Sequence, residues 1–243
     1  DKERQAVEAI MPNQGKQITI QTVDGGVYAR YPIRTQVIMP GDDLDGLVGE
    51  YVVPHLQADD IVFLSEKIVA IVQGRAFPVR DIHPSLFARF MSKFVHKSAY
   101  GIGLGSPWTM ELAVREVGRL KIFLTAIIAG IAKLFGKKGV FYEILGPQVA
   151  AIDGPCHYTL PPYNEYAKLA PKDPDQVASR LKERFGRHFV IVDANDFGVE
   201  ILGKSDPHLD NELLKQIFKD NPLGQSTQQT PIAIIRKAPA TLQ

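Results

Sequence analysis

Alternating polar and apolar residues predict strands in several parts of the chain. Residues 17–23 (QITIQTV) alternate with the period of two that is typical of a half-buried strand. A turn signal follows at residues 24–26 (DGG), and residues 27–38 continue in an extended pattern, so we expect a β-hairpin. The apolar segments 188–192 and 231–236 predict two further strands.

Apolar residues spaced three and four positions apart predict helices. Leu44, Leu47, Val48 and Tyr51 follow this spacing after a break at residues 40–43 (PGDD), where Asp42 or Asp43 can cap the first turn. A second helix start stands at residues 173–176 (DPDQ), with Asp173 as the capping carboxylate and Gly186 as the stop. We expect further helices over residues 84–97, 107–119, 120–135 and 210–218.

Three further runs predict extended structure because they are apolar. Residues 61–72 (IVFLSEKIVAIV) are rich in β-branched side chains, which indicates a strand buried on both faces or a strand pair with a kink. Residues 140–144 and 149–152 are shorter, and we expect both to be extended.

The most apolar stretch is residues 120–135 (LKIFLTAIIAGIAKLF), and it contains two lysines. A membrane-spanning helix needs about 20 apolar residues, so we expect no membrane span here. We expect a helix packed on the protein, with largely buried side chains at Ile127, Ile128, Ile131 and Leu134. The alternative is an amphipathic helix on a membrane surface, because Lys133, Lys137 and Lys138 cluster at one end.

The order of these elements indicates an α+β fold with mixed sheets and packed helices, because strands and helices follow no strict βαβ rhythm. We expect residues 1–26 to form an N-terminal arm and the first strand, and residues 27–243 to form a single unit. Two lobes with a boundary near residues 145–150 are the alternative.

Composition excludes several classes of protein. The chain is 45% hydrophobic with a net charge of +1, which disfavours disorder and gives no reason to expect nucleic-acid binding. A single cysteine cannot form an internal disulfide, and the first residues (DKERQ) show no signal-peptide pattern. We therefore expect a cytoplasmic protein.

Two carboxylates follow apolar segments that read as strands. Asp153 comes after residues 149–152, and Asp193 comes after residues 188–192. A carboxylate at the carboxyl end of a strand lies where open α/β sheets bind ligands, and two of them suit Mg²⁺ or Mn²⁺ shared with a phosphate. The alternative is that each aspartate caps a turn.

The same segments resemble the coenzyme F420-0:L-glutamate ligase family, the gamma-glutamyl ligases. The opening of that family is similar to PIRTQVIMPGDDL at residues 32–44 and ADDIVFLSEKIVAIVQGR at residues 58–75. Its later segments are similar, in the same order, to AIDG (151–154), LPPYNEYAKLAPKDPDQVASRLKERF (160–185) and VIVDANDFG (190–198). Its nucleotide-contacting C-terminal end is similar to the last helix, the loop at residues 221–230 and PIAIIRKA (231–238).

The resemblance implies the fold and the chemistry of these ligases. Such enzymes use GTP (or ATP) and Mg²⁺ or Mn²⁺ to convert a substrate carboxylate into an acyl phosphate, which the amine of glutamate attacks. Asp153 and Asp193 match metal-binding aspartates of the family. Two segments match its nucleotide contacts: Pro32, Ile33, Arg34 and Thr35, and then Ser65, Glu66 and Lys67. The implied partners are a small-molecule substrate and a nucleotide, and a homodimer is left open.

Departures from the family pattern concern cations and polar side chains. Ile71 stands in place of a lysine, Val149 and Cys156 in place of asparagines, and Ala194 in place of a threonine. The arginines expected after Asp193 are missing from residues 196–200 (DFGVE). Lys67, Arg75, Lys204 and Arg34 are the candidates to replace the lost charge.

These departures leave three functions open: a divergent amide ligase, a non-catalytic nucleotide- or metabolite-binding relative, and another phosphate-handling enzyme on the same scaffold. The catalytic residues and the acceptor stay unassigned.

Overall fold

The chain forms two compact units in the computed structural model. The first contains residues 1–73 and 172–243, and the second contains residues 74–171. The structure describes residues 10–95, 103–157, 159–195, 198–224 and 226–238. Where the chain leaves and re-enters the first unit, the Gln73 side-chain amide donates to the Lys172 carbonyl at 2.9 Å and accepts from the Lys172 N–H at 2.7 Å.

A mixed six-stranded sheet forms the centre of the first unit, with the order β1-β2-β8-β3-β6-β7. Only β3 and β6 run parallel, and the other neighbours are antiparallel. The predicted hairpin is confirmed, as are the strands near residues 188 and 231. The strands are β1 (Thr19–Gln21), β2 (Val27–Ile33), β3 (Ile61–Ser65), β6 (His188–Asn195), β7 (Gly198–Lys204) and β8 (Ile232–Lys237).

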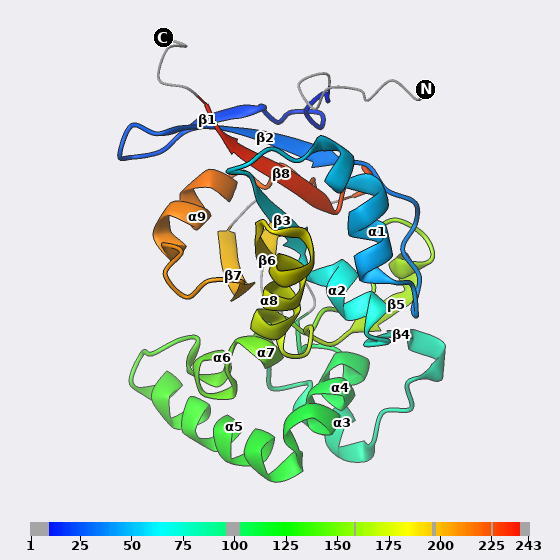
Figure 1. The fold of residues 1–243 in the computed structure, drawn as a ribbon. Coiled ribbons are helices and arrows are strands. Elements are labelled where there is room, and N and C mark those ends of the chain that lie inside the picture. Colours follow the sequence, from blue (N-terminus) through cyan, green and yellow to red (C-terminus); the bar gives the residue numbers. More distant parts are fainter. Residues whose placement is uncertain (1–9, 96–102, 158, 196–197, 225, 239–243) are drawn as a thin grey trace. The chain divides into compact units, whose positions relative to one another are not determined.

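Helices of the first unit pack on this sheet (Figure 1). On one face, Phe63 of β3 stacks on Phe218 of α9 with ring centroids 4.5 Å apart. Because side chains alternate along a strand, Leu64 points to the other face of the sheet. The helix α8 packs on β6 and β7. The helices are α1 (Leu44–Tyr51), the 3₁₀ turn η2 (Val53–His55), α2 (Glu66–Val72), α8 (Pro174–Phe185) and α9 (Asn211–Phe218).

Two predictions for the first unit need correction. The run 61–72 is a strand followed by a helix, because Ser65 ends β3 and its hydroxyl accepts the N–H of Lys67 to cap α2. Asp173 does precede α8, but it adopts a left-handed conformation (φ 47°) and its side chain makes no capping hydrogen bond. The predicted stop at Gly186 is confirmed by its left-handed φ of 68°.

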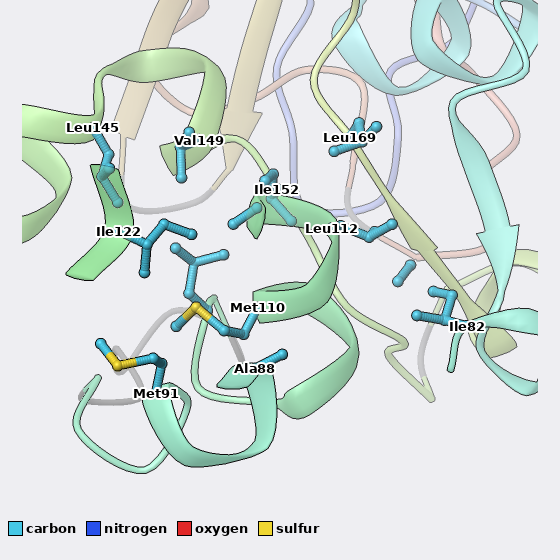
Figure 2. Close-up of a cluster of buried hydrophobic side chains, with 13 residues drawn as sticks. Ile82, Ala88, Met91, Met110, Leu112, Ile122, Leu145, Val149, Ile152 and Leu169 are labelled. Carbon is cyan, nitrogen blue, oxygen red and sulfur yellow. The ribbon is translucent and has the colours of Figure 1, made fainter. Parts of the chain in front are cut away.

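The second unit is mainly helical, with one two-stranded antiparallel sheet. Its core is a cluster of buried aliphatic and methionine side chains from several helices, including Met110, Leu112, Ile122 and Val149 (Figure 2). The elements are β4 (Ala76–Pro78), η3 (Val79–Asp81), α3 (Leu86–Met91), α4 (Pro107–Val117), α5 (Arg119–Leu134), α6 (Val140–Leu145), α7 (Pro147–Ala150), η4 (Tyr163–Glu165) and β5 (Tyr166–Lys168).

The predictions of extended structure in the second unit are wrong. Residues 140–144 lie in α6, and residues 149–152 begin in the last turn of α7. Gly139 and Gly146, with φ of 85° and 89°, precede these two short helices. Both glycines adopt a backbone conformation that other residues rarely reach, so they fix the turns between the helices.

The helix predicted at 120–135 exists as α5, but its predicted buried side is wrong. Ile127, Ile128, Ile131 and Leu134 are all exposed, with Ile128 at 50% and Leu134 at 85%. The fold is α+β, as predicted. Within the described ranges, the length and apolar character of every helix fall short of what crossing a membrane requires.

Candidate functional site

The start of β8 brings together two segments that are far apart in the sequence. Ile232, the first residue of β8, pairs with Ile33 at the end of β2 and with Leu64 near the end of β3. The segments 32–35 and 65–67, which the family resemblance assigns to nucleotide contacts, therefore meet at one edge of the sheet. We call this region the β8 edge.

Thr35 anchors the first of these segments to the loop before β8. Its N–H donates to the carbonyl of Gln229 at 3.1 Å, and the Gln229 side-chain amide donates back to the Thr35 carbonyl at 3.0 Å. Thr35 is buried, as are Pro32 and Ile33, whereas Arg34 is exposed. Arg34 is thus the member of this segment that can reach a ligand in solvent.

Ser65 fixes the second segment on the other side of β8. Its N–H donates to the carbonyl of Pro231 at 2.9 Å, and its hydroxyl accepts from the Lys67 N–H at 3.3 Å. Glu66 is buried in the first turn of α2, and Lys67 is half-buried. The change from strand to helix at Ser65 therefore places residues 65–67 next to the β8 edge.

Asp193 reaches the same region through β6. Strands β3 and β6 are parallel and Ser65 pairs with Val192, so Asp193 comes one residue beyond this pair. Val192 belongs to the core cluster under α9, and alternation turns Asp193 to the opposite face. The structure thus brings Asp193 together with the Ser65 segment within the first unit.

Two cations of the β8 edge are available to a ligand. In the part of the chain that the structure describes, the side chains of Lys67 and Arg34 have no hydrogen-bond or ion-pair partner. A cation without a carboxylate partner, close in the chain to the Ser65 hydroxyl, suits an anionic ligand such as a phosphate.

The other two candidate cations are engaged elsewhere. The Lys204 ammonium donates to the carbonyl of Leu209 at 2.6 Å. Arg75 belongs to the second unit, where it donates to the Ala170 carbonyl at 2.6 Å and pairs with Glu116 at 2.8 Å. These contacts give both side chains structural roles.

Asp153 lies in the second unit and follows a helical turn rather than a strand, which corrects the sequence prediction. Its backbone forms an isolated bridge with Lys168, with N–O distances of 3.1 and 2.9 Å. Its carboxylate accepts the N–H of Gly154 at 2.9 Å, as expected for an aspartate that caps a turn. A metal ion shared by Asp153 and Asp193 stays a prediction.

Several departures from the family pattern have a structural role. Ile71 is buried in α2, and Val149 is fully buried in the core of the second unit. Ala194 packs against the core cluster of the first unit. These three positions therefore contribute to packing, and Asp196 lies outside the described residues.

Gln229 is a member of this region that the sequence analysis did not single out. It adopts a left-handed backbone (φ 61°) and clamps Thr35 on both its N–H and its carbonyl side. The resemblance matched its loop, residues 221–230, to the nucleotide-contacting end of the family but named no residue in that loop. Among the described residues, no three His, Cys, Asp or Glu side chains form a group that could hold a metal ion.

Comparison with known proteins agrees with the motif order. A search of curated proteins finds no match to the chain. The profile of the family described as F420-0:Gamma-glutamyl ligase matches residues 32–196. This range includes residues 32–35, residues 65–67 and Asp193. This match supports a ligase-like function. The chain therefore belongs to the F420-0:gamma-glutamyl ligase family.

Proposed function

We propose that this protein is a divergent amide ligase that uses a nucleoside triphosphate and a divalent cation to activate a carboxylate acceptor. The observation that carries the proposal is the double pairing of Ile232 with Ile33 and Leu64. This pairing brings the segments of Arg34 and Lys67 together, and the parallel pairing of β3 with β6 adds Asp193 at the same edge of the sheet.

The reaction would have two steps, phosphorylation of the acceptor carboxylate and attack of an amine on the resulting acyl phosphate. An oxygen of the acceptor carboxylate attacks the γ-phosphorus, and the bond to the bridging oxygen breaks to release the nucleoside diphosphate. An amine nitrogen then attacks the acyl carbon, inorganic phosphate leaves and the amine loses a proton. Lys67 and Arg34 would neutralise the phosphates, because phosphoryl transfer depends on positioning and on charge stabilisation.

The donor set of the β8 edge fits a cation that is shared with the nucleotide. Mg²⁺ usually takes one or two protein carboxylates and completes its shell with phosphate oxygens and water. Asp193 would supply one such carboxylate, and Asp153 stays a predicted second ligand. When bound, the cation would supply charge neutralisation at the phosphates.

The second candidate is a non-catalytic relative that binds a nucleotide or metabolite at the same edge. Its support comes from Ile71 and Val149, which pack in the two cores where the family carries polar side chains. A protein that kept the site for binding alone would not need these polar side chains.

Nucleotide binding is tested first by thermal shift and calorimetry with GTP and ATP, each with and without Mg²⁺ or Mn²⁺. A ligand that binds only the folded state raises the melting temperature. We expect a shift that needs the metal and is reduced in Lys67→Gln. The exposed Lys219 serves as the control, and Lys219→Gln should behave as the unchanged protein.

Turnover then separates the two candidates. Phosphate release that depends on both a carboxylic acid and an amine, with an amide product found by mass, supports the ligase. Nucleotide binding without such release across a panel of carboxylic acids supports the binding protein. An absent shift with every nucleotide and metal would overturn both.

A further inference from the structure

The helix α5 presents its bulky apolar side chains outwards. Its buried residues are Ile122, which points into the core cluster of the second unit (Figure 2), and Thr125. The half-buried positions on the same side are alanines: Ala126, Ala129 and Ala132. In most surface helices the large apolar residues face the core, so the orientation of α5 is inverted.

The outward side of α5 is a continuous apolar surface. At 3.6 residues per turn, the exposed apolar residues of α5, with Phe135 directly after it, cover an arc of roughly 140°. No polar residue lies within this arc. The residues of the arc are Leu120, Phe123, Leu124, Ile127, Ile128, Ile131, Leu134 and Phe135. We call this set the α5 face. Within the second unit α5 contacts α4 and α6, which lie along one side of it (Figure 1).

Basic residues surround the α5 face. Between Val117 and Tyr142 the chain contains no aspartate or glutamate. The same stretch contains Arg119, Lys121, Lys133, Lys137 and Lys138. The nearest exposed carboxylate is Glu143 of α6, so positive charge predominates around the face. A large exposed apolar patch rimmed by polar residues marks an interaction site, and an excess of positive charge around it favours an anionic partner.

The charge and the length of α5 decide between occupants. A second copy docked face to face would bring two sets of five cations together, and Glu143 of α6 is too little to offset them. A span across a bilayer is excluded because α5 has 16 residues, and about 20 are needed. Arg119 and Lys121 border the α5 face, and Lys137 and Lys138 follow its C-terminal end. A wide apolar face with cations placed in this way suits the boundary between lipid headgroups and acyl chains.

We propose that α5 docks this protein onto an anionic lipid membrane, with the helix lying in the plane of the interface. The α5 face enters the acyl boundary, while Lys121, Lys137 and Lys138 extend their ammonium groups to lipid phosphates. The proposal is independent of the reaction at the β8 edge.

Vesicle flotation with the full chain tests the proposal. We use vesicles of phosphatidylcholine alone and of phosphatidylcholine with an equal part of phosphatidylglycerol, at low and high salt. We expect binding to the anionic vesicles only, and weaker binding at high salt because screening acts on the lysines.

Two sets of variants separate the apolar and the charged contributions. Leu124→Gln with Ile128→Gln should abolish flotation, and glutamine keeps the helix propensity. The control is Met39→Gln with Val53→Gln, which changes exposed apolar residues of the first unit and should float unchanged. Each lysine removed in Lys121→Gln, Lys137→Gln or Lys138→Gln should weaken binding about five-fold.

The depth of the helix gives a second readout. A tryptophan placed by Phe123→Trp in a Trp108→Phe background should be quenched by lipids with brominated acyl chains. Light scattering establishes the oligomeric state of the same samples. A failure of the unchanged protein to float, equal binding to neutral vesicles, or a dimer that the Leu124→Gln with Ile128→Gln variant dissociates would overturn the proposal.

Discussion

Arg30 is the largest fully buried side chain of the protein, and its guanidinium is bound by both carboxylate oxygens of Asp220. Further donors of the same guanidinium reach the carbonyls of Gln17 at 2.7 Å and Ile217 at 3.1 Å. Arg30 therefore joins β2 to the end of α9 and to the segment before β1. Loss of the Asp220 carboxylate would leave the buried guanidinium without its counter-ion, which is unfavourable in free energy. Two predictions follow.

The first prediction concerns stability at neutral pH. Asp220→Ala should lower the free energy of unfolding by about 1–3 kcal/mol, because a buried charged donor loses its acceptor. Urea unfolding measures the change. The exposed Asp59 provides the control, and Asp59→Ala should leave the midpoint nearly unchanged. Equal effects of both substitutions would show that the pair contributes nothing.

The second prediction concerns acid stability. Burial alone would raise the pKa of Asp220, but the hydrogen bond and charge of Arg30 outweigh it and hold this pKa below the usual 3.8. The pKa of Asp220 is lower in the folded than in the unfolded protein. Its contribution to the free energy of unfolding is therefore complete above about pH 5 and is lost as pH falls through the folded pKa. The difference in unfolding free energy between the unchanged protein and Asp220→Asn should therefore shrink below about pH 4. A difference that grows on acidification would contradict this sign.

The third prediction compares two isoleucines of α5. Ile122 is fully buried, so Ile122→Ala should cost about 2–5 kcal/mol as a cavity-forming change. Ile128 is 50% exposed, and Ile128→Ala should change stability by about 0.5 kcal/mol or less, as other surface substitutions do. Thermal unfolding of the pair measures both, and a large loss in Ile128→Ala would show that the α5 face is covered in the free protein.

The fourth prediction concerns the contact of β7 with α8. A Cβ added at Gly203 would lie 2.5 Å from the carbonyl carbon of Pro174 and 2.7 Å from the N–H nitrogen of Asp175. Gly203→Ala should therefore destabilise the protein by about 1–3 kcal/mol through overpacking. Gly130 in α5 has open space, so Gly130→Ala should stabilise it by about 0.5–1 kcal/mol. Chemical unfolding compares the two, and a tolerated Gly203→Ala would show that α8 can move away.

The fifth prediction concerns the reaction of the family. We expect weak triphosphate binding and no glutamylation of the deazaflavin acceptor, because Ile71 and the missing arginines remove phosphate-binding charge. An assay with GTP, Mn²⁺, glutamate and the deazaflavin acceptor, followed by product mass, measures it. Robust glutamylation would show that Lys67, Arg34 and backbone N–H groups suffice.

Much of the first unit could be predicted from its sequence, because local patterns determine local structure. The period of two in residues 17–23 gave the hairpin, and the spacing of Leu44, Leu47 and Val48 gave α1. The run 61–72 was harder, since strand and helix share its β-branched composition. Only the capping hydroxyl of Ser65 marks the change.

The errors arise where tertiary packing decides. The stretch 120–135 is apolar on nearly every side, so periodicity alone could not tell that Ile122 faces the core and Ile128 faces outwards. At the candidate site, the resemblance grouped residues 32–35 with residues 65–67. The strand that joins them begins at Ile232, and no local pattern reveals its neighbours.

The central position of β8 also sets an order of events during synthesis. The strands β2 and β3 are made early, but each must wait for β8, which is encoded near the end of the chain and lies between them. The second unit is continuous from residue 74 to 171 and can fold as soon as it leaves the ribosome. The β8 edge is consequently the last part of the protein to form, so a chain that ends prematurely before residue 232 would retain a helical unit and lack the strand on which the β8 edge is built.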